Sequence, residues 1–195
     1  MPDVPLLERI AACRVCEAVL PLGPRPVVRI SDPRATIVVI GHAPGTKVHA
    51  SGIPWDDVSG KRLRDWLGVE PETFYDESKF ASLPMGFCYP GVDRHGGDLP
   101  PRPECAPLWH PRVLPLLPAV RLTLLIGSHA LAYYLRERRK ATLSETVAAW
   151  RDYEPSGFIP LVHPSPRNQM WLKRNPWFEA EMVPHLRDRV ARALS

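Results

Sequence analysis

Four short apolar runs, partly β-branched, alternate along the chain with longer mixed segments. They predict buried strands at 36–40, 85–89, 122–126 and 158–162. Helix-like patterns separate these runs, at 60–67, 104–117, 128–139 and 175–194. Because strands and helices alternate, the pattern favours an α/β fold in which helices cover both faces of a parallel sheet.

Residues that favour helix starts and loops support this reading. Ser128 suits the N-cap of the third helix, and Asn175 followed by Pro176 suits the start of the last. Proline is abundant, 24 of 195 residues, and lies beside the apolar runs rather than in a tail. This placement predicts long ordered loops rather than disorder.

Each predicted strand runs into a distinctive loop. The four loops read G-H-A-P-G at 41–45, Y-P-G-V-D at 89–93, G-S-H at 127–129 and H-P-S-P-R-N at 163–168. In open parallel sheets, ligands bind beyond the carboxyl ends of the strands, so we expect these loops to share one rim. In the last loop, Pro164 and Pro166 stiffen the backbone and fix where His163 and Arg167 point.

Length and composition fit one soluble globular domain spanning residues 1–195, with 45% apolar and 24% charged residues. No run approaches the roughly 18 apolar residues that a membrane span needs, and the first residues do not resemble a secretory signal. We therefore expect a cytoplasmic protein without a membrane partner. Lysines and arginines (25) exceed aspartates and glutamates (21), which weakly favours a polyanionic partner.

The four cysteines form one tight pair and one spaced pair. Cys13 and Cys16 belong to C-R-V-C, whereas Cys88 and Cys105 flank a loop rich in proline and glycine. This use of every cysteine indicates a four-thiolate metal site, for which zinc and an iron–sulfur cluster both qualify. The spacing differs from that of a zinc ribbon, which makes zinc the less favoured of the two. Disulfides, disfavoured in a reducing cytosol, and free buried cysteines are the alternatives.

Several of these motifs together resemble the uracil-DNA glycosylase superfamily. They are G-H-A-P-G after a strand, Pro54-Trp55 about ten residues on, and H-P-S-P-R-N after the last strand. The cysteine layout is similar to that of the iron–sulfur branches, families four and five. The resemblance covers roughly residues 10–190. It implies a three-layer α/β/α sandwich with a central four-stranded parallel sheet, and a structural [4Fe–4S] cluster on the four cysteines, with zinc as the alternative.

The resemblance also implies roles for individual residues. His163 would donate a hydrogen bond to the base oxygen on which negative charge develops. Trp55 would stack on the extruded base. The loop beneath base and sugar would consist of Gly41, His42, Ala43, Pro44 and Gly45, where small residues permit close approach.

The loop after the last strand would face DNA. Ser165, Arg167 and Asn168 would lie towards the minor groove and the phosphates, and Arg167 suits both. The motif H-P-S-P-R-N is also similar to the corresponding motif of the single-strand-selective uracil glycosylases.

Two positions depart from family four. His42 stands where that family usually has glutamate, so the water would be oriented by His42 itself, by Asp56 or by Asp57. Pro84 stands where family four has the asparagine that reads the uracil edge, and proline has no side-chain hydrogen bonds to offer. Uracil selectivity is then weaker, supplied by other groups, or moved to another damaged base such as hypoxanthine.

We therefore expect a monomeric, monofunctional DNA glycosylase of base excision repair. It would flip uracil or a related deaminated base out of single- or double-stranded DNA and hydrolyse its N-glycosidic bond, leaving an abasic site. No lysine in the motifs suggests Schiff-base chemistry. One alternative is an altered iron–sulfur relative that only binds damaged or single-stranded DNA. Another is a zinc-stabilised α/β hydrolase or nucleotide-binding protein that shares the sheet topology alone.

Overall fold

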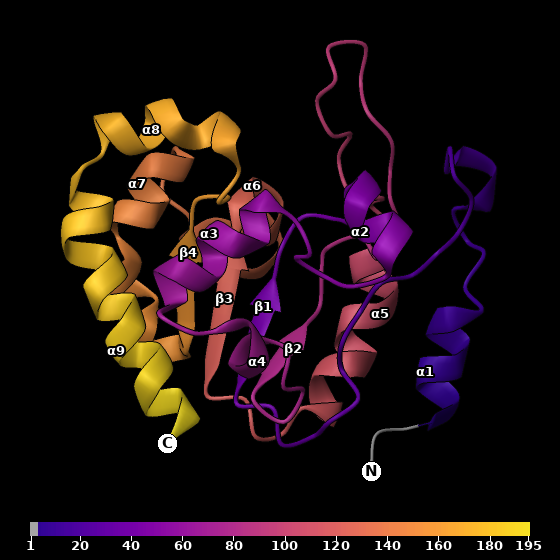
Figure 1. Ribbon diagram of the computed structural model, residues 1–195, viewed down its shortest axis with the longest axis horizontal. Helices are drawn as coiled ribbons and strands as arrows, with labels where there is room; N and C mark the ends of the chain where they lie inside the picture. Colours follow the sequence, from indigo (N-terminus) through magenta and orange to yellow (C-terminus); the bar gives the residue numbers. More distant parts are fainter. Residues whose placement is uncertain (1–3) are drawn as a thin grey trace.

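A four-stranded parallel sheet forms the centre of the computed structural model, which describes residues 4–195 (Figure 1). Its strands are β1 (Ile37–Ile40), β2 (Phe80–Ser82), β3 (Leu122–Ile126) and β4 (Phe158–Leu161), in the order β2-β1-β3-β4. Ile37 of β1 lies opposite Phe80 of β2 and Leu122 of β3, and Leu161 of β4 lies opposite Ile126. Every neighbouring pair is parallel, which confirms the predicted sheet.

Helices lie on both faces of this sheet and complete the three-layer α/β/α arrangement (Figure 1). The helix bounds are α1 (Val4–Ala11), α2 (Thr46–Ser51), α3 (Val58–Leu67), α4 (Pro71–Phe74), α5 (Cys105–Val113), α6 (Gly127–Leu135), α7 (Leu143–Ala148), α8 (Gln169–Arg174) and α9 (Val183–Leu194). Short 3-10 turns occur at Glu17–Val19, Leu114–Leu116, Arg136–Arg138, Trp150–Asp152, Glu154–Ser156 and Pro166–Asn168. In the described part of the chain, no helix is long and apolar enough to cross a membrane.

Helix α3 illustrates how local sequence places a functional segment. The Asp57 carboxylate caps it by accepting the Gly60 backbone N–H at 2.7 Å, and the helix ends at Gly68 in the left-handed conformation. Leu63 and Leu67, one turn apart, are fully buried against the core. A Cβ atom at Gly60 would lie 1.7 Å from the Trp55 carbonyl oxygen, so only glycine lets α3 approach this backbone.

The strand predicted at 85–89 is wrong, because the second strand is β2 at Phe80–Ser82. The run 85–89 is irregular yet buried: the Met85 and Gly86 N–H groups donate to the carbonyls of Gly41 and His42 at 2.9 and 3.0 Å. Its apolar character reflects packing against the loop after β1. The Leu83 N–H likewise donates to the Val39 carbonyl at 3.0 Å, so the chain stays beside β1 beyond the end of β2.

One predicted helix start and the interior of another predicted helix also differ. Helix α6 begins at Gly127, so Ser128 lies inside its first turn and not at the N-cap. The Asn175 side chain donates to the Trp171 carbonyl at 2.8 Å and accepts from the Trp177 indole at 3.2 Å, which joins α8 to the next turn. The predicted helix 175–194 contains a π-helical turn, Phe178–Met182, before α9. Pro184 lacks the N–H that a regular helix would need there.

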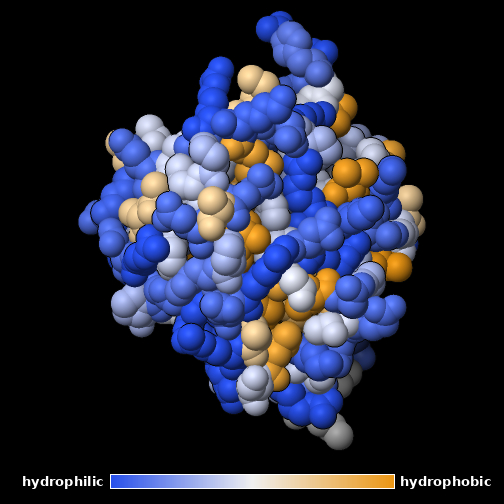
Figure 2. All heavy atoms as spheres, turned by 60° about the vertical axis from the view of Figure 1, so that its left-hand side comes forward, coloured by the Kyte–Doolittle hydropathy of each residue, from blue (hydrophilic) through white to orange (hydrophobic). Residues whose placement is uncertain are grey.

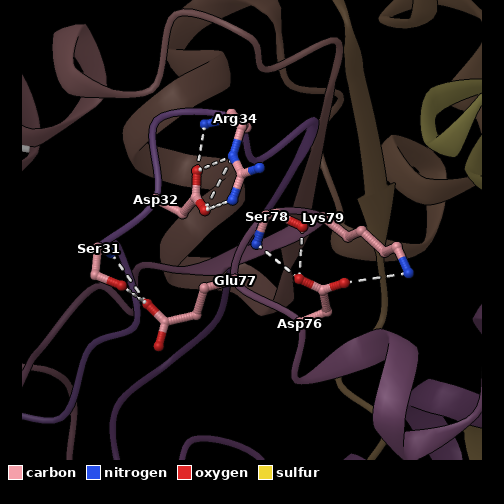
Figure 3. Close-up of polar contacts among 7 residues, drawn as sticks. All are labelled: Ser31, Asp32, Arg34, Asp76, Glu77, Ser78 and Lys79. Atoms are coloured by element: carbon pink, nitrogen blue, oxygen red, sulfur yellow. Dashed lines mark hydrogen bonds and ion pairs between the residues drawn. The ribbon is translucent and has the colours of Figure 1, made fainter. Parts of the chain in front are cut away.

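Paired charges hold the turns that lead into β1 and β2 (Figure 3). Arg34 donates to both carboxylate oxygens of Asp32, and these bonds lower the pKa of Asp32 to about 2. Asp76 accepts from the Ser78 hydroxyl at 2.6 Å and pairs with Lys79 at 3.1 Å. Beside them Glu77 accepts from Ser31 and also pairs with Arg29. These contacts lie at the amino edge of the sheet.

Candidate active site

A cavity of about 380 Å³ opens at the carboxyl edge of the sheet, where the loops after the strands meet. Of the residues predicted for the site, the lining includes Gly41, His42, Ala43, Pro44, Gly45, Trp55, Asp57, His163, Ser165, Arg167 and Asn168. Asp56 is exposed and does not belong to this lining. Three of the four predicted loops therefore meet in one cavity, whereas Y-P-G-V-D at 89–93 does not line it; the chain beyond that motif contributes Gly97 and Asp98 instead.

Trp55 and His163 face each other in this cavity. Their ring centroids lie 5.8 Å apart with 31° between the planes. The Trp55 backbone has a positive φ of 61°, unusual for a tryptophan, and its carbonyl accepts from the Arg64 guanidinium at 3.3 Å. Its indole lies against Gly41, where a Cβ atom would be only 2.6 Å from Cζ2. Gly41 thus makes room for the indole in the lining.

His163 is oriented by its own loop. Its Nδ1 accepts the Ser165 backbone N–H at 3.2 Å, and its carbonyl accepts from the Asn168 side chain at 2.8 Å. Burial lowers the pKa of His163, and the carboxylates of Asp57 and Asp98 oppose this shift. At neutral pH the imidazole is therefore neutral. Because Nδ1 is an acceptor, the proton lies on Nε2, which is free to donate.

His42 is also kept neutral. Burial, and then the neighbouring imidazoles of His129 and His163, lower its pKa to about 4, with Asp98 opposing. The rings of His42 and His129 meet edge-to-face at 5.1 Å. A neutral imidazole in this position can accept a hydrogen bond from a water molecule and orient it.

Asp57 and Asp98 are the two carboxylates of the cavity lining. Asp57 accepts the Gly60 N–H and is thereby committed to capping α3. Asp98 comes from the loop between Cys88 and Cys105, and sequence reasoning missed it because its position depends on how that loop folds back. The hydroxyl-bearing residues Ser82 and Ser128 were missed too. Ser128 belongs to the predicted rim motif G-S-H, which could have identified it.

Pro84 lines the cavity and presents no polar side chain there. Its carbonyl oxygen accepts from Nε2 of the buried His110 at 3.0 Å, and Nδ1 of His110 accepts from the Tyr134 hydroxyl at 2.6 Å. Helix α5, which carries His110, thereby holds this wall of the cavity in place.

A family model described as the uracil DNA glycosylase superfamily matches residues 28–187, most of the chain and nearly all of the cavity lining. The chain belongs to the uracil DNA glycosylase superfamily. Proteins of this superfamily act on DNA as glycosylase hydrolases, so the cavity at the carboxyl edge is the place to look for glycosidic chemistry.

The loop after β4 holds the residues predicted to face DNA in this superfamily member. The Ser165 hydroxyl accepts the Arg167 backbone N–H at 3.2 Å, and Arg62 of α3 donates to the Ser165 carbonyl at 3.4 Å. Ser165 and Asn168 thus shape the loop around His163. Arg167 is 63% exposed and donates to the Gly96 carbonyl at 2.6 Å, so its guanidinium reaches across the cavity mouth to loop 89–104.

Loop 89–104 projects beyond the carboxyl edge of the sheet (Figure 1). Its tip is hydrophilic (Figure 2) and includes exposed Arg94 and His95. A projecting polar loop next to the cavity is available to contact the nucleic acid on which this superfamily acts.

The four cysteines line a second, smaller pocket at the base of this loop. All four are free thiols, and the Phe87 N–H donates to the sulfur of Cys105 at 3.3 Å. Burial raises the pKa of Cys88 and raises that of Cys105 to about 12. Among residues 4–195, no group of three or more His, Cys, Asp or Glu side chains is placed to hold a metal ion. The thiols therefore converge on one pocket without forming a compact single-ion site.

Proposed function

We propose that the protein is a monofunctional DNA glycosylase that removes uracil or a related deaminated base from DNA and leaves an abasic site for base excision repair. One observation carries the proposal: His163, whose Nδ1 accepts the Ser165 N–H, faces the indole of Trp55 inside a cavity at the carboxyl edge of the sheet. This pairs a donor for the departing base with a surface on which the base can stack.

The reaction requires the nucleotide to leave the base stack, because its glycosidic bond is inaccessible in a duplex. The bond between C1′ and the base nitrogen breaks with both electrons going to the base. The Nε2–H of His163 stabilises the base anion, and the backbone of Gly41 and Gly45 allows close approach of base and sugar. Water oriented by His42 adds its oxygen to C1′, and the proton that it loses neutralises the base. The protein would perform this reaction as a monomer.

The four cysteines fit a [4Fe–4S] cluster in our proposal. Four thiols converge on one pocket, an amide N–H donates to the sulfur of Cys105, and Leu20, Phe87 and Trp109 supply an apolar surround. The cysteine spacing differs from the C-x2-C…C-x2-C pattern of a zinc ribbon, which favours the cluster over zinc. When bound, it would serve structurally by holding the N-terminal segment to loop 89–104.

The cluster has a direct test. Purified protein would be yellow-brown with broad visible absorption, and would contain iron and sulfide. Colourless protein with one equivalent of zinc would assign the same four thiols to zinc.

Substrate range is the second part of the proposal, and Pro84 motivates it. Since Pro84 offers no side-chain hydrogen bond, the base edge meets other groups of the lining, among them the hydroxyl of Ser82. Uracil N3–H and O4 present the same donor–acceptor pair as N1–H and O6 of hypoxanthine. A panel of single-lesion oligonucleotides with uracil, hypoxanthine or xanthine, single- and double-stranded, would rank these bases.

The decisive assay incubates each oligonucleotide with protein, cleaves abasic sites with alkali and measures strand breaks. We expect breaks at uracil or a related base, falling about 10²–10³-fold in His163→Ala, the loss typical of a transition-state donor. Equal thermal melting of both proteins would show that the fold is kept. Wild-type protein that breaks no lesion, yet binds the same DNA, would establish the non-catalytic alternative instead.

A further inference from the structure

Loop 89–104 brings a carboxylate to the cavity mouth. Asp98 lines the same cavity as His42 and His163, although it comes from a segment outside the motifs of the site. Of the two carboxylates in the lining, Asp57 caps α3, whereas Asp98 makes no such backbone contact in the described residues. Asp98 is therefore the carboxylate of the lining that is not engaged in a helix cap.

The loop itself is built to hold Asp98 in place. A tight turn forms around Asp93, whose Oδ1 accepts the N–H groups of His95 and Gly97 at 2.8 Å each. Beyond the turn, Val92 and Asp98 form an antiparallel bridge, and the Leu99 N–H donates to the carbonyl of residue 91 at 3.0 Å. These bonds turn the loop into a short hairpin that ends with Asp98 over the cavity.

Arg167 anchors this hairpin from the opposite rim. Its guanidinium donates to the Gly96 carbonyl at 2.6 Å and lies 3.9 Å from the Asp98 carboxylate. In the free protein the guanidinium thus partly neutralises Asp98. DNA phosphates bind arginine strongly, and a phosphate that draws Arg167 away would leave the Asp98 charge facing the cavity.

We propose that Asp98 supplies the negative charge that the glycosidic reaction needs, by stabilising the sugar cation and the imidazoles beside it. This inference rests on the proposed function and names a residue whose charge would act on the reacting sugar. Breaking the glycosidic bond leaves positive charge on the sugar, which a nearby carboxylate attracts. Asp98 is 56% exposed in the free protein, so water screens it there, and DNA covering the mouth strengthens the attraction.

The charges around the two histidines agree with this placement. His42 faces His129, His163 and Asp98, and Asp98 is the group in that set that favours protonation. His163 faces Asp57 and Asp98, both of which oppose the effect of burial on its pKa. Asp98 is therefore the charge that acts on both histidines.

The kinetic test compares Asp98→Asn and Asp98→Glu with Asp188→Asn, which changes the net charge equally on the exposed surface of α9. Single-turnover excision is measured on the base that wild-type protein removes best. We expect Asp98→Asn to lose about 10- to 100-fold in rate with DNA affinity unchanged or higher, and Asp98→Glu to recover most of it. Asp188→Asn should match wild type.

A second measurement distinguishes the electrostatic effect of Asp98 from an effect of the substitution on folding. Proton NMR titration of the histidine ring signals should show lower pKa values for His42 and His163 in Asp98→Asn, and an unchanged value for His129, whose pKa reflects burial alone. Equal rates in Asp98→Asn and Asp188→Asn, or unchanged pKa values of His42 and His163, would overturn the role of Asp98. A wild-type protein that excises no base would overturn the proposed function itself.

Discussion

Polar side chains have different environments at the two edges of the sheet. At the amino edge, Asp32 pairs with Arg34 and Asp76 with Lys79, partners only two or three residues apart. At the carboxyl edge, His42 and His163 come from distant segments and are kept neutral by burial around a cavity. Charges satisfied by sequence neighbours stabilise turns. Polar groups left with free hydrogen-bonding capacity around a cavity are available for chemistry.

The largest expected effect comes from a substitution that pushes α3 away from Trp55 at the carboxyl edge. In Gly60→Ala the new Cβ would collide with the Trp55 carbonyl oxygen, a backbone atom that cannot swing aside. We expect a loss of about 3 kcal/mol in the free energy of unfolding, measured by urea denaturation. Gly45→Ala is the matched control for stability, because nothing lies within 4 Å of its new Cβ. Equal urea midpoints for the two variants would refute the close approach.

Acidification should weaken the carboxyl edge first. Since the pKa of His42 is about 4 in the folded protein and 6.5 is its ordinary value, the unfolded state binds more protons between those pH values. Stability is unaffected by His42 above pH 6.5 and falls as the pH drops towards 4, by on the order of 3 kcal/mol in total. Urea midpoints across this range should decline less in His42→Gln. His110, also shifted to about 4, accounts for part of the remaining decline.

A methyl group at Gly41 should separate activity from stability. Its Cβ would meet the outer ring atoms of the Trp55 indole, which can move, so the fold should remain close to wild type in thermal melting. Moving the indole disturbs its position opposite His163, and we expect base excision to slow about 10- to 100-fold. An active Gly41→Ala protein would show that the position of Trp55 is unimportant.

The smallest effects should distinguish two exposed arginines. Arg34→Gln removes a partner of Asp32 at the amino edge, and we expect unchanged DNA affinity and only a small decrease in the urea midpoint, because the pair is exposed. Arg167→Gln should weaken DNA binding and reduce the slope of log affinity against log salt by about one, as loss of a phosphate contact does. Identical salt slopes for both variants would remove Arg167 from the DNA interface.

Most of the sheet was predictable because β1, β3 and β4 are apolar runs that must be buried. The second strand was missed because it has only three residues and ends in Ser82, while the neighbouring run 85–89 is apolar for a different reason, its packing against the loop after β1. An apolar run in the sequence predicts that a segment is buried. Whether that segment forms a strand depends on the backbone that it pairs with in the folded protein.

The cavity residues that belong to a stiff local motif were predictable. His163 is one, because hydrogen bonds within its own loop hold it, and Trp55, which lies just before α3, is another. Asp98 was not, because its place over the cavity depends on the hairpin around Asp93 and on the reach of Arg167. Asp56 lies outside the cavity because its neighbour Asp57 turns inward to cap the helix. Which of these two adjacent carboxylates lines the cavity depends on which of them becomes the N-cap of α3.

Helix α5 begins with Cys105 in the thiol pocket and, five residues on, carries the imidazole that holds the Pro84 carbonyl at the cavity wall. Cys105 and His110 lie within the first two turns of this helix, about 7.5 Å apart along its axis. Oxidation of the thiol end would therefore displace His110 and, through the Pro84 carbonyl, one wall of the cavity, although none of the four cysteines lines that cavity.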